Sequence, residues 1–282
     1  MTPELSIVIP WSNRPELGPT LQQNAGAFEC LDAEVLVINC GGDRDTLERL
    51  AGDAPLRAPR IIEVPSGQFN KCLALNIGAS LARGPRLLFL DTDIVISGAV
   101  LAGLVARTDA RTFATIEWVL DSTAASRATE LAHSTQTVEL VWTNGRRMSF
   151  EFFRSRTADQ ARGGPGLISV WKEHFLTVEG MDSRLVRWGW EDLDLIIRLQ
   201  AMTGARRVQI GDAIHLAHDD ASRNLSGTTR QASLQRNMAL CYANYERGDF
   251  LGTLSRDVAA HQGRLIEHEW CRIRSVPADS PL

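Results

Sequence analysis

Short apolar runs rich in β-branched residues alternate with helical segments along the first ninety residues. The runs are residues 5–10, 34–39, 60–64 and 86–90, and the helical segments between them include 45–51 and 70–82. Each run has the length and composition of a buried strand. Strands that alternate with helices form a mainly parallel sheet with helices on both faces, and ligands bind beyond the carboxyl ends of such strands. The sequence therefore predicts an α/β, Rossmann-like fold and draws attention to the residues that follow each strand.

The middle of the chain has a weaker pattern. Between Thr108 and about Pro165 the periodicity blurs, and Thr, Arg, Ser and Gly accumulate. Trp118 and Trp142 lie in this stretch and need burial. We therefore expect irregular structure and short strands here, with a turn at the glycine-rich residues 163–166.

The last third is predicted to be mostly helical. Residues 191–202 form a helix, residues 207–210 a late strand, and the tail at 230–274 is largely helical. Mixed charges in the tail favour packing on the core or on a second subunit over docking to a membrane. The polar segment at 219–231 is either a lid that closes over a ligand or a plain surface loop.

Composition and charge exclude several classes of protein. The chain has 282 residues, 44% of them hydrophobic, with a net charge of −4, so nucleic acid is not an expected partner. The five cysteines contain no C-x-x-C pair, which argues against a zinc site and for a reducing, cytoplasmic location. A strand that starts at Leu5 leaves no room for a signal peptide, and the longest uncharged apolar run, 94–106, is too short for a transmembrane helix. We expect a soluble protein, at most peripheral to a membrane, which can form a homo-oligomer.

The first motif that carries chemistry is Asp91-Thr92-Asp93, directly after the strand at 86–90. Two carboxylates one residue apart at a strand end supply hard oxygen ligands that suit Mg²⁺ or Mn²⁺ and the diphosphate that such an ion neutralises. The alternative is that both aspartates cap a turn and the next helix.

The second motif is Trp188-Gly189-Trp190, followed at once by Glu191, Asp192 and, two residues later, Asp194. Indole faces stack well on sugar rings, a glycine permits close approach, and a neighbouring carboxylate can take a proton from a sugar hydroxyl. The alternative is a helix cap, because acidic residues are favoured in the first turn of a helix.

The third motif is His215-Leu216-Ala217-His218, followed by Asp219-Asp220. An imidazole at a strand end can complete a metal shell that is otherwise made of oxygen ligands. Either histidine alone is more often a structural residue, so this motif gains weight from its position after the other two.

Together these motifs resemble the GT-A glycosyltransferases, in particular family 2 with a galactosyltransferase-like C-terminal segment. The residues that carry the resemblance are 5–10 with Asn13 and Arg14, 34–42, 69–84, Asp91-Thr92-Asp93, 180–182, 188–195 and 215–218. The match spans residues 5–220. It implies a GT-A domain at 1–220, with a nucleotide-binding half at 1–107 and an acceptor-binding half at 108–220. Residues 221–282 would form the lid and a helical C-terminal extension.

The resemblance also implies a role for each matching residue. Asp93 would bind Mn²⁺ or Mg²⁺, and Asp91 would touch the ribose or the ion; His218 would be a further ligand, with His215 as another candidate. Asp192 would be the general base of an inverting hexosyl transfer, and Glu191 would hold donor or acceptor hydroxyls. The sugar platform would be Trp188, Gly189 and Trp190. The residues that would bind the nucleotide-diphosphate sugar are Pro10, Asn13, Arg14, Asn39, Lys71, Asn76, Asp91, Thr92 and Asp93.

One position departs from the family pattern, which usually has an aspartate where Asn39 stands. An amide can accept the hydrogen bond from a uracil N3–H, but it can donate as well. A UDP-sugar is therefore the favoured donor, without exclusion of other nucleotides. The acceptor is a glycan or a small molecule that carries a hydroxyl group.

Three other classes of protein share part of this pattern. A phosphohydrolase of the haloacid dehalogenase type also has D-x-D after an apolar strand, but on its first strand, and that class leaves 188–192 unexplained. A retaining glycosyltransferase would use the same metal set without a base. A catalytically silent sugar-nucleotide-binding protein would bind UDP without transfer, and the complete acidic set argues against it.

Overall fold

The computed structural model of the chain describes residues 2–55, 59–123, 133–156, 161–218 and 227–268. Its first half is a parallel sheet in the order β3-β2-β1-β4. These strands are β1 (Leu5–Trp11), β2 (Glu34–Cys40), β3 (Arg60–Val64) and β4 (Arg86–Phe89). Nearly every residue of the four strands is buried, because helices cover both faces of the sheet. The four predicted strands are confirmed.

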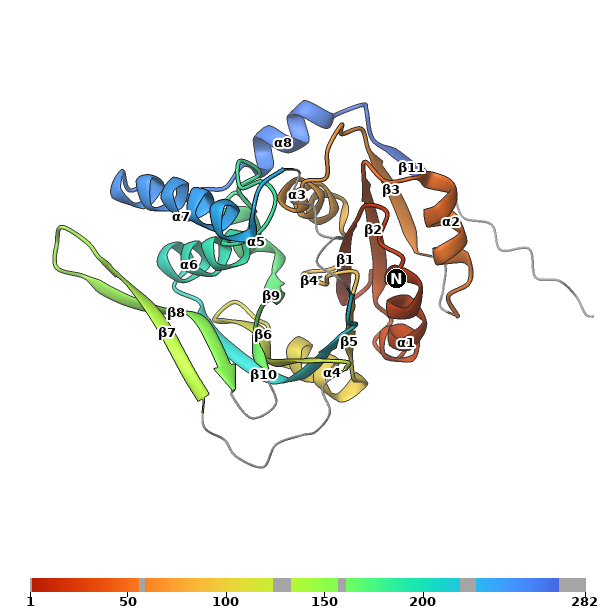
Figure 1. Cartoon of the computed structure of the whole chain (residues 1–282), viewed down its shortest axis with the longest axis horizontal. Coiled ribbons are helices and arrows are strands. Elements are labelled where there is room, and N and C mark those ends of the chain that lie inside the picture. The colour runs from red at the N-terminus through yellow and green to blue at the C-terminus, as the bar shows by residue number, and fades with distance from the viewer. Residues whose placement is uncertain (1, 56–58, 124–132, 157–160, 219–226, 269–282) are drawn as a thin grey trace, which may run out of the picture.

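Helices cover the sheet in two layers (Figure 1). One layer packs on a hydrophobic cluster that includes Phe28, Leu47 and Leu104, and it consists of α1 (Leu17–Cys30), α2 (Arg44–Gly52) and α4 (Gly98–Ala106). The other layer packs on a second cluster and consists of α3 (Lys71–Leu81), α5 (Lys172–Thr177) and α6 (Glu191–Thr203). The side chains of Asp43 and Asn70 accept backbone N–H bonds at the starts of α2 and α3, which fixes where these predicted helices begin.

The second half of the sheet is mixed. Beyond β4 the order is β9-β6-β10-β5, with β9 antiparallel to both of its neighbours and β10 parallel to β6. The strands are β5 (Ile94–Ile96), β6 (Thr112–Asp121), β9 (Arg162–Trp171) and β10 (Arg206–His215). A long hairpin of β7 (His133–Val141) and β8 (Arg147–Arg156) branches from β9 and extends away from the body of the molecule (Figure 1).

The expectation of strands between Thr108 and Pro165 is confirmed by β6, β7 and β8, although they are longer than expected, and the predicted turn at 163–166 is wrong. Residues 162–171 form a strand, and the glycines lie inside it. A Cβ atom on Gly164 would lie 2.9 Å from Ile116 Cβ, at a point where the pairing of β6 with β9 shifts register. Glycine is required here for close approach of two strands at a bulge, and local composition does not distinguish that requirement from a turn.

The tail follows the prediction only in part. It contains α7 (Arg230–Glu246) and α8 (Leu254–His261), but it ends in a short strand, β11 (Ile266–His268), which pairs antiparallel with β3. Tyr245 and Leu254 are buried in the core cluster, so the tail packs on the core. Residues 219–226, which form most of the predicted lid, and 269–274 lie outside the described residues. Within the described ranges, no helix combines the length and the apolar character needed to span a membrane.

Candidate active site

Two strand ends meet at one edge of the sheet. Asp91-Thr92-Asp93 connects β4 to β5, and β5 pairs antiparallel with the end of β10, where Ile94 lies opposite His215. The backbone N–H of Leu216 donates to the carbonyl of Asp93 over 2.7 Å. This pairing brings the first and third motifs together, although they are far apart in the sequence.

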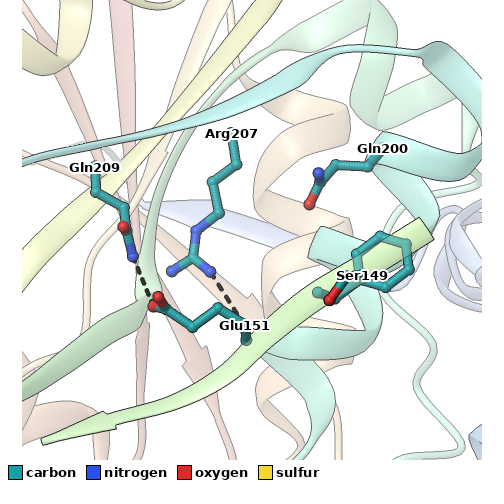
Figure 2. A pocket seen from close by; sticks show the side chains of 6 residues that line it. Ser149, Glu151, Gln200, Arg207 and Gln209 are labelled. Carbon is teal, nitrogen blue, oxygen red and sulfur yellow. Dashed lines mark hydrogen bonds between the residues drawn. The ribbon is translucent and has the colours of Figure 1, made fainter. Parts of the chain in front are cut away.

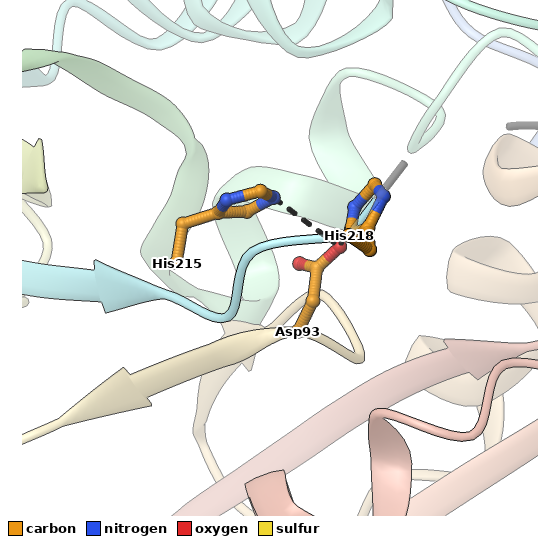
Figure 3. A group of neighbouring side chains, drawn as sticks. All are labelled: Asp93, His215 and His218. Carbon is orange, nitrogen blue, oxygen red and sulfur yellow. Dashed lines mark hydrogen bonds and ion pairs between the residues drawn. The ribbon is translucent and has the colours of Figure 1, made fainter. Parts of the chain in front are cut away.

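Asp93, His215 and His218 form a compact cluster of potential metal ligands (Figure 3). Asp93 Oδ2 lies 3.1 Å from His218 Nε2 and 3.6 Å from His215 Nε2. One ligand atom from each residue lies within 4.8 Å of the others, and all three side chains are at most 15% exposed. The cluster therefore has the size and chemistry of a site for one divalent cation.

Arg14 adds a positive charge to this cluster. Its guanidinium lies 3.2 Å from Asp93 Oδ2. Burial by itself would raise the pKa of Asp93, but the interaction with His215 and the charge of Arg14 lower it overall. The Asp93 carboxylate is therefore held in the ionised form that binds a metal.

Lys71, at the start of α3, joins the first and second motifs. Its ammonium lies 3.0 Å from Asp91 Oδ1 and 3.1 Å from Asp192 Oδ1. Glu191 Oε1 is farther away, at 3.9 Å. Burial would lower the pKa of Lys71, but the three surrounding carboxylates raise it well above its usual value. Lys71 is thus a buried cation that holds one carboxylate from each motif, and Asp91 pairs with it, outside the cluster of Asp93, His215 and His218.

Glu191 and Asp192 begin α6 beside Lys71. Glu191 is 8% exposed, and its Oε2 is buried without a hydrogen-bond partner among the described residues. Burial first, and then the charge of Asp192, raise the pKa of Glu191 to about 7. Buried carboxylates with a strongly perturbed pKa are common at functional sites.

Gly166 on β9 lines this site, and the sequence motifs did not predict it. A Cβ atom at Gly166 would lie 2.8 Å from Asp192 Oδ2 and 3.5 Å from Asp91 Oδ2. The available signal was the glycine cluster at 163–166, which the sequence analysis assigned to a turn.

Two predicted nucleotide-binding residues are corrected by the structure, because Asn39 and Asn76 are fully buried. Asn39 accepts from the N–H of Gly42 and donates to the carboxylate of Glu63 at 3.0 Å. Asn76 donates to Asp257 Oδ2 at 2.8 Å and exchanges two bonds with the backbone of Met181. Both amides hold loops in place and present no surface to a ligand.

The remaining predicted nucleotide-binding residues lie near the ends of β1 and β4. Pro10 is buried within β1, and Thr92 is 6% exposed with its carbonyl accepting from Thr20 Oγ1. Asn13 is exposed, has a positive φ of 55°, and accepts from the N–H of Asp43. Of these three, Asn13 alone presents an exposed side chain.

The predicted sugar platform is also corrected in part. Trp190 is 6% exposed and packs against the rings of Phe152 and Tyr242, so its indole belongs to the core. Gly189 has a φ of +96° and faces Leu234 of α7, so glycine is needed there for backbone conformation and helix packing. Trp188 stays partly exposed.

Arg230, at the start of α7, lies over the Trp188 ring, 4.4 Å from its centroid. This contact covers one face of the ring. Any sugar that stacks on Trp188 must therefore use the other face or displace Arg230.

A separate hollow lies between α6, β8 and β10, lined by Ser149, Phe150, Glu151, Gln200, Arg207 and Gln209 (Figure 2). Its polar side chains bond to one another and to neighbours outside the lining. Gln209 Nε2 donates to Glu151 Oε1 at 2.8 Å, and Arg154 donates to both Glu151 and Gln209. None of its lining residues belongs to the three motifs.

Comparison with protein families decides the class of the protein. The model for glycosyl transferase family 2 matches residues 6–159, more than half of the chain. The chain belongs to glycosyl transferase family 2. A second model, the N-terminal domain of galactosyltransferase, matches residues 146–219, which contain the second and third motifs. The resemblance inferred from the motifs is confirmed, and the protein is a glycosyltransferase.

Solved structures show that this glycosyltransferase has the GT-A fold. The mannosyltransferase PcManGT from Pyrobaculum calidifontis, in complex with GDP-Man and Mn²⁺, is 13% identical with a TM-score of 0.51, over 93% of this chain and 76% of that one. Glucosyl-3-phosphoglycerate synthase from Mycobacterium tuberculosis, in complex with Mn²⁺, UDP and glucosyl-3-phosphoglycerate, is 15% identical with a TM-score of 0.52, over 86% and 79%. No curated protein matches the sequence.

Proposed function

We propose that this glycosyltransferase moves a hexose from a nucleotide-diphosphate donor to an acceptor hydroxyl, with a bound Mn²⁺ or Mg²⁺ and with inversion at the anomeric carbon. The observation that carries the proposal is the continuity of the site. The cluster of Asp93, His215 and His218 is joined through the D-x-D loop to Lys71, and Lys71 contacts Asp192.

The residues present fit a divalent cation. The cluster offers one carboxylate oxygen and two imidazole nitrogens within 4.8 Å, a mixed oxygen and nitrogen set that suits Mn²⁺. Both similar structures contain Mn²⁺ with a nucleotide or nucleotide sugar, which agrees with this assignment. When bound, the ion supplies positive charge that stabilises the leaving diphosphate.

The chain's own residues would perform the other tasks. Arg14, beside Asp93, would contact a phosphate oxygen. Lys71 holds Asp91 and Asp192 on the two sides of its ammonium, so it fixes the base relative to the donor loop. Asp192 is 20% exposed and would accept the proton of the acceptor hydroxyl as the oxygen attacks the anomeric carbon. Glu191, also beside Lys71, would hold a sugar hydroxyl.

A UDP-sugar is the donor that we propose to test first. The two similar structures carry different bases, GDP-Man in one and UDP in the other. The side chain of Asn39 is hydrogen-bonded to Gly42 and Glu63, so other groups at the ends of β1 and β2 must select the nucleotide base. A thermal-shift screen of UDP- and GDP-sugars, with and without Mn²⁺, would identify the donor.

Two substitutions test the division of roles. D192N should reduce transfer by about 10²–10⁴-fold, because it removes the base, while Mn²⁺-dependent donor binding measured by calorimetry stays close to wild type. D93A should weaken metal-dependent donor binding itself. D212N, at an exposed position on β10, is the control and should change neither property.

Loss of donor binding in D192N would indicate that Asp192 belongs to the nucleotide site and would refute its role as base. Inversion is tested separately by the anomeric configuration of the product. Retention of configuration would show that the reaction proceeds without this base.

A further inference from the structure

We propose that Asp121 is a positioning residue that selects the tautomer and the orientation of His215 for metal binding. Nothing in the sequence motifs points to Asp121. The inference rests on the proposed function, because it assigns His215 to the metal cluster.

The sheet register places the two residues together. β6 and β10 run parallel, and Asp121 and His215 are the last pair of their ladder. The N–H of Ser122 donates to the carbonyl of His215 over 2.9 Å. Ser122 Oγ in turn accepts from the N–H of Ala217 over 3.0 Å. The end of β6 therefore holds the backbone of the loop that carries both histidines.

The imidazole of His215 lies between two carboxylates. Its Nε2 is 3.6 Å from Asp93 Oδ2, on the side of the metal cluster, and its Nδ1 is 3.4 Å from Asp121 Oδ2. His215 Nδ1 is buried and makes no hydrogen bond among the described residues, so the Asp121 carboxylate at 3.4 Å is an acceptor within reach of its proton. Histidine ligands of metals commonly give the proton of the second ring nitrogen to a carboxylate, which fixes the tautomer and the ring plane.

The carboxylate of Asp121 is itself held in place. Its Oδ1 accepts from the N–H of Thr123 over 3.0 Å and from Thr123 Oγ1 over 2.7 Å. Those two bonds occupy Oδ1 and leave Oδ2 directed at His215. An imidazole with its proton on Nδ1, facing Asp121, has its lone pair on Nε2, facing the cluster.

This geometry predicts how replacement of Asp121 by asparagine changes the tautomer of His215. The N–H of Thr123 donates to the position of Oδ1, which favours the carbonyl oxygen of the amide there in a D121N variant. The amide NH₂ would then face His215 Nδ1 and donate to it. That arrangement favours the proton on Nε2, which removes the lone pair needed for metal binding.

The test is Mn²⁺ affinity, measured by calorimetry and by the electron paramagnetic resonance of free Mn²⁺, on wild type, D121A, D121N, D93A and D212N. Removing a carboxylate that supports a histidine ligand typically costs about 10–100-fold in metal affinity, and we expect that loss for D121A. D121N should lose at least as much as D121A, although it is the smaller change. D212N, an exposed aspartate on the neighbouring strand, should match wild type.

A second measurement needs no metal. Nitrogen-15 NMR of the histidine side chains should show the Nδ1–H tautomer of His215 in wild type and a shift toward Nε2–H in D121N. Thermal unfolding of each variant separates a local change from loss of the fold.

The outcomes distinguish this inference from the proposed function. If D93A loses Mn²⁺ and both Asp121 variants bind it as wild type does, the role of Asp121 is refuted and the metal site stands. If D121N binds Mn²⁺ better than D121A, the tautomer argument is refuted. If wild type and D93A bind Mn²⁺ equally weakly, the metal site and this inference both fall.

Discussion

Replacing Glu191 with glutamine should make this glycosyltransferase more stable at alkaline pH, while it impairs transfer. Burial and the charge of Asp192 raise the pKa of Glu191 from 4.5 to about 7. Between these two values the folded protein binds a proton that the unfolded chain has released. The contribution of Glu191 to stability is therefore present at low pH and is lost as the pH rises through about 7.

The size of the effect follows from the two pKa values. With a pKa of about 7 in the folded state and 4.5 in the unfolded state, Glu191 makes the free energy of unfolding fall by about 2.5 kcal/mol between pH 5 and pH 8. The side chain is 11% exposed, so solvent screening reduces this value little. Glutamine at this position does not titrate. In a chain of this length, about 2.5 kcal/mol corresponds to roughly 4 °C in Tm.

The assay is urea unfolding of wild type and E191Q at several values between pH 5 and pH 8, without metal or donor. The difference in unfolding free energy between E191Q and wild type should grow in favour of E191Q as the pH rises. E246Q, at an exposed position near the end of α7, should follow the wild-type curve. Parallel curves for wild type and E191Q over the whole range would refute the argument that Glu191 is buried at an energetic cost. A gain in stability together with lost transfer would be the usual exchange between activity and stability at an active site.

Two further substitutions test the strand that lines the site and the helix that carries the proposed base. G166A should lower transfer by at least about 10-fold with little loss of Tm, because its methyl group would lie 2.8 Å from Asp192 Oδ2. Unchanged turnover would show that β9 or Asp192 can shift to accommodate the methyl group. D194A should lower the free energy of unfolding, measured in urea, by about 3–5 kcal/mol. The substitution removes the ion-pair partner of the buried Arg198 guanidinium, which lies 2.7 Å from Asp194, and it removes the acceptor of the Tyr245 hydroxyl. A loss below about 1 kcal/mol in D194A would show that water reaches Arg198.

Local sequence was sufficient for the parallel half of the fold. The strands at 5–10, 34–39 and 60–64 are short runs rich in β-branched and apolar residues, and such runs are buried in a sheet that helices cover on both faces. Local sequence was insufficient to predict β9. Gly164 and Gly166 allow this strand to approach β6 and α6 closely, and both elements are remote from β9 in the sequence. Local sequence was insufficient for β11 as well, because three residues form a strand only where β3 offers a free edge.

The sequence by itself determined the class of the protein and pointed to most of the groups that we propose for its site. Asp93, His215, His218 and the acid pair at 191–192 were predicted from residue type, spacing and order, because those properties lie in the chain and require no coordinates. Only the tertiary structure decided how these groups are distributed. In the folded chain Asp91 pairs with Lys71, the Trp190 side chain is buried in the core, and Asp121 lies next to His215 Nδ1. Such contacts depend on sheet register and on packing between distant segments, and a local pattern holds no information about which distant residue it will meet.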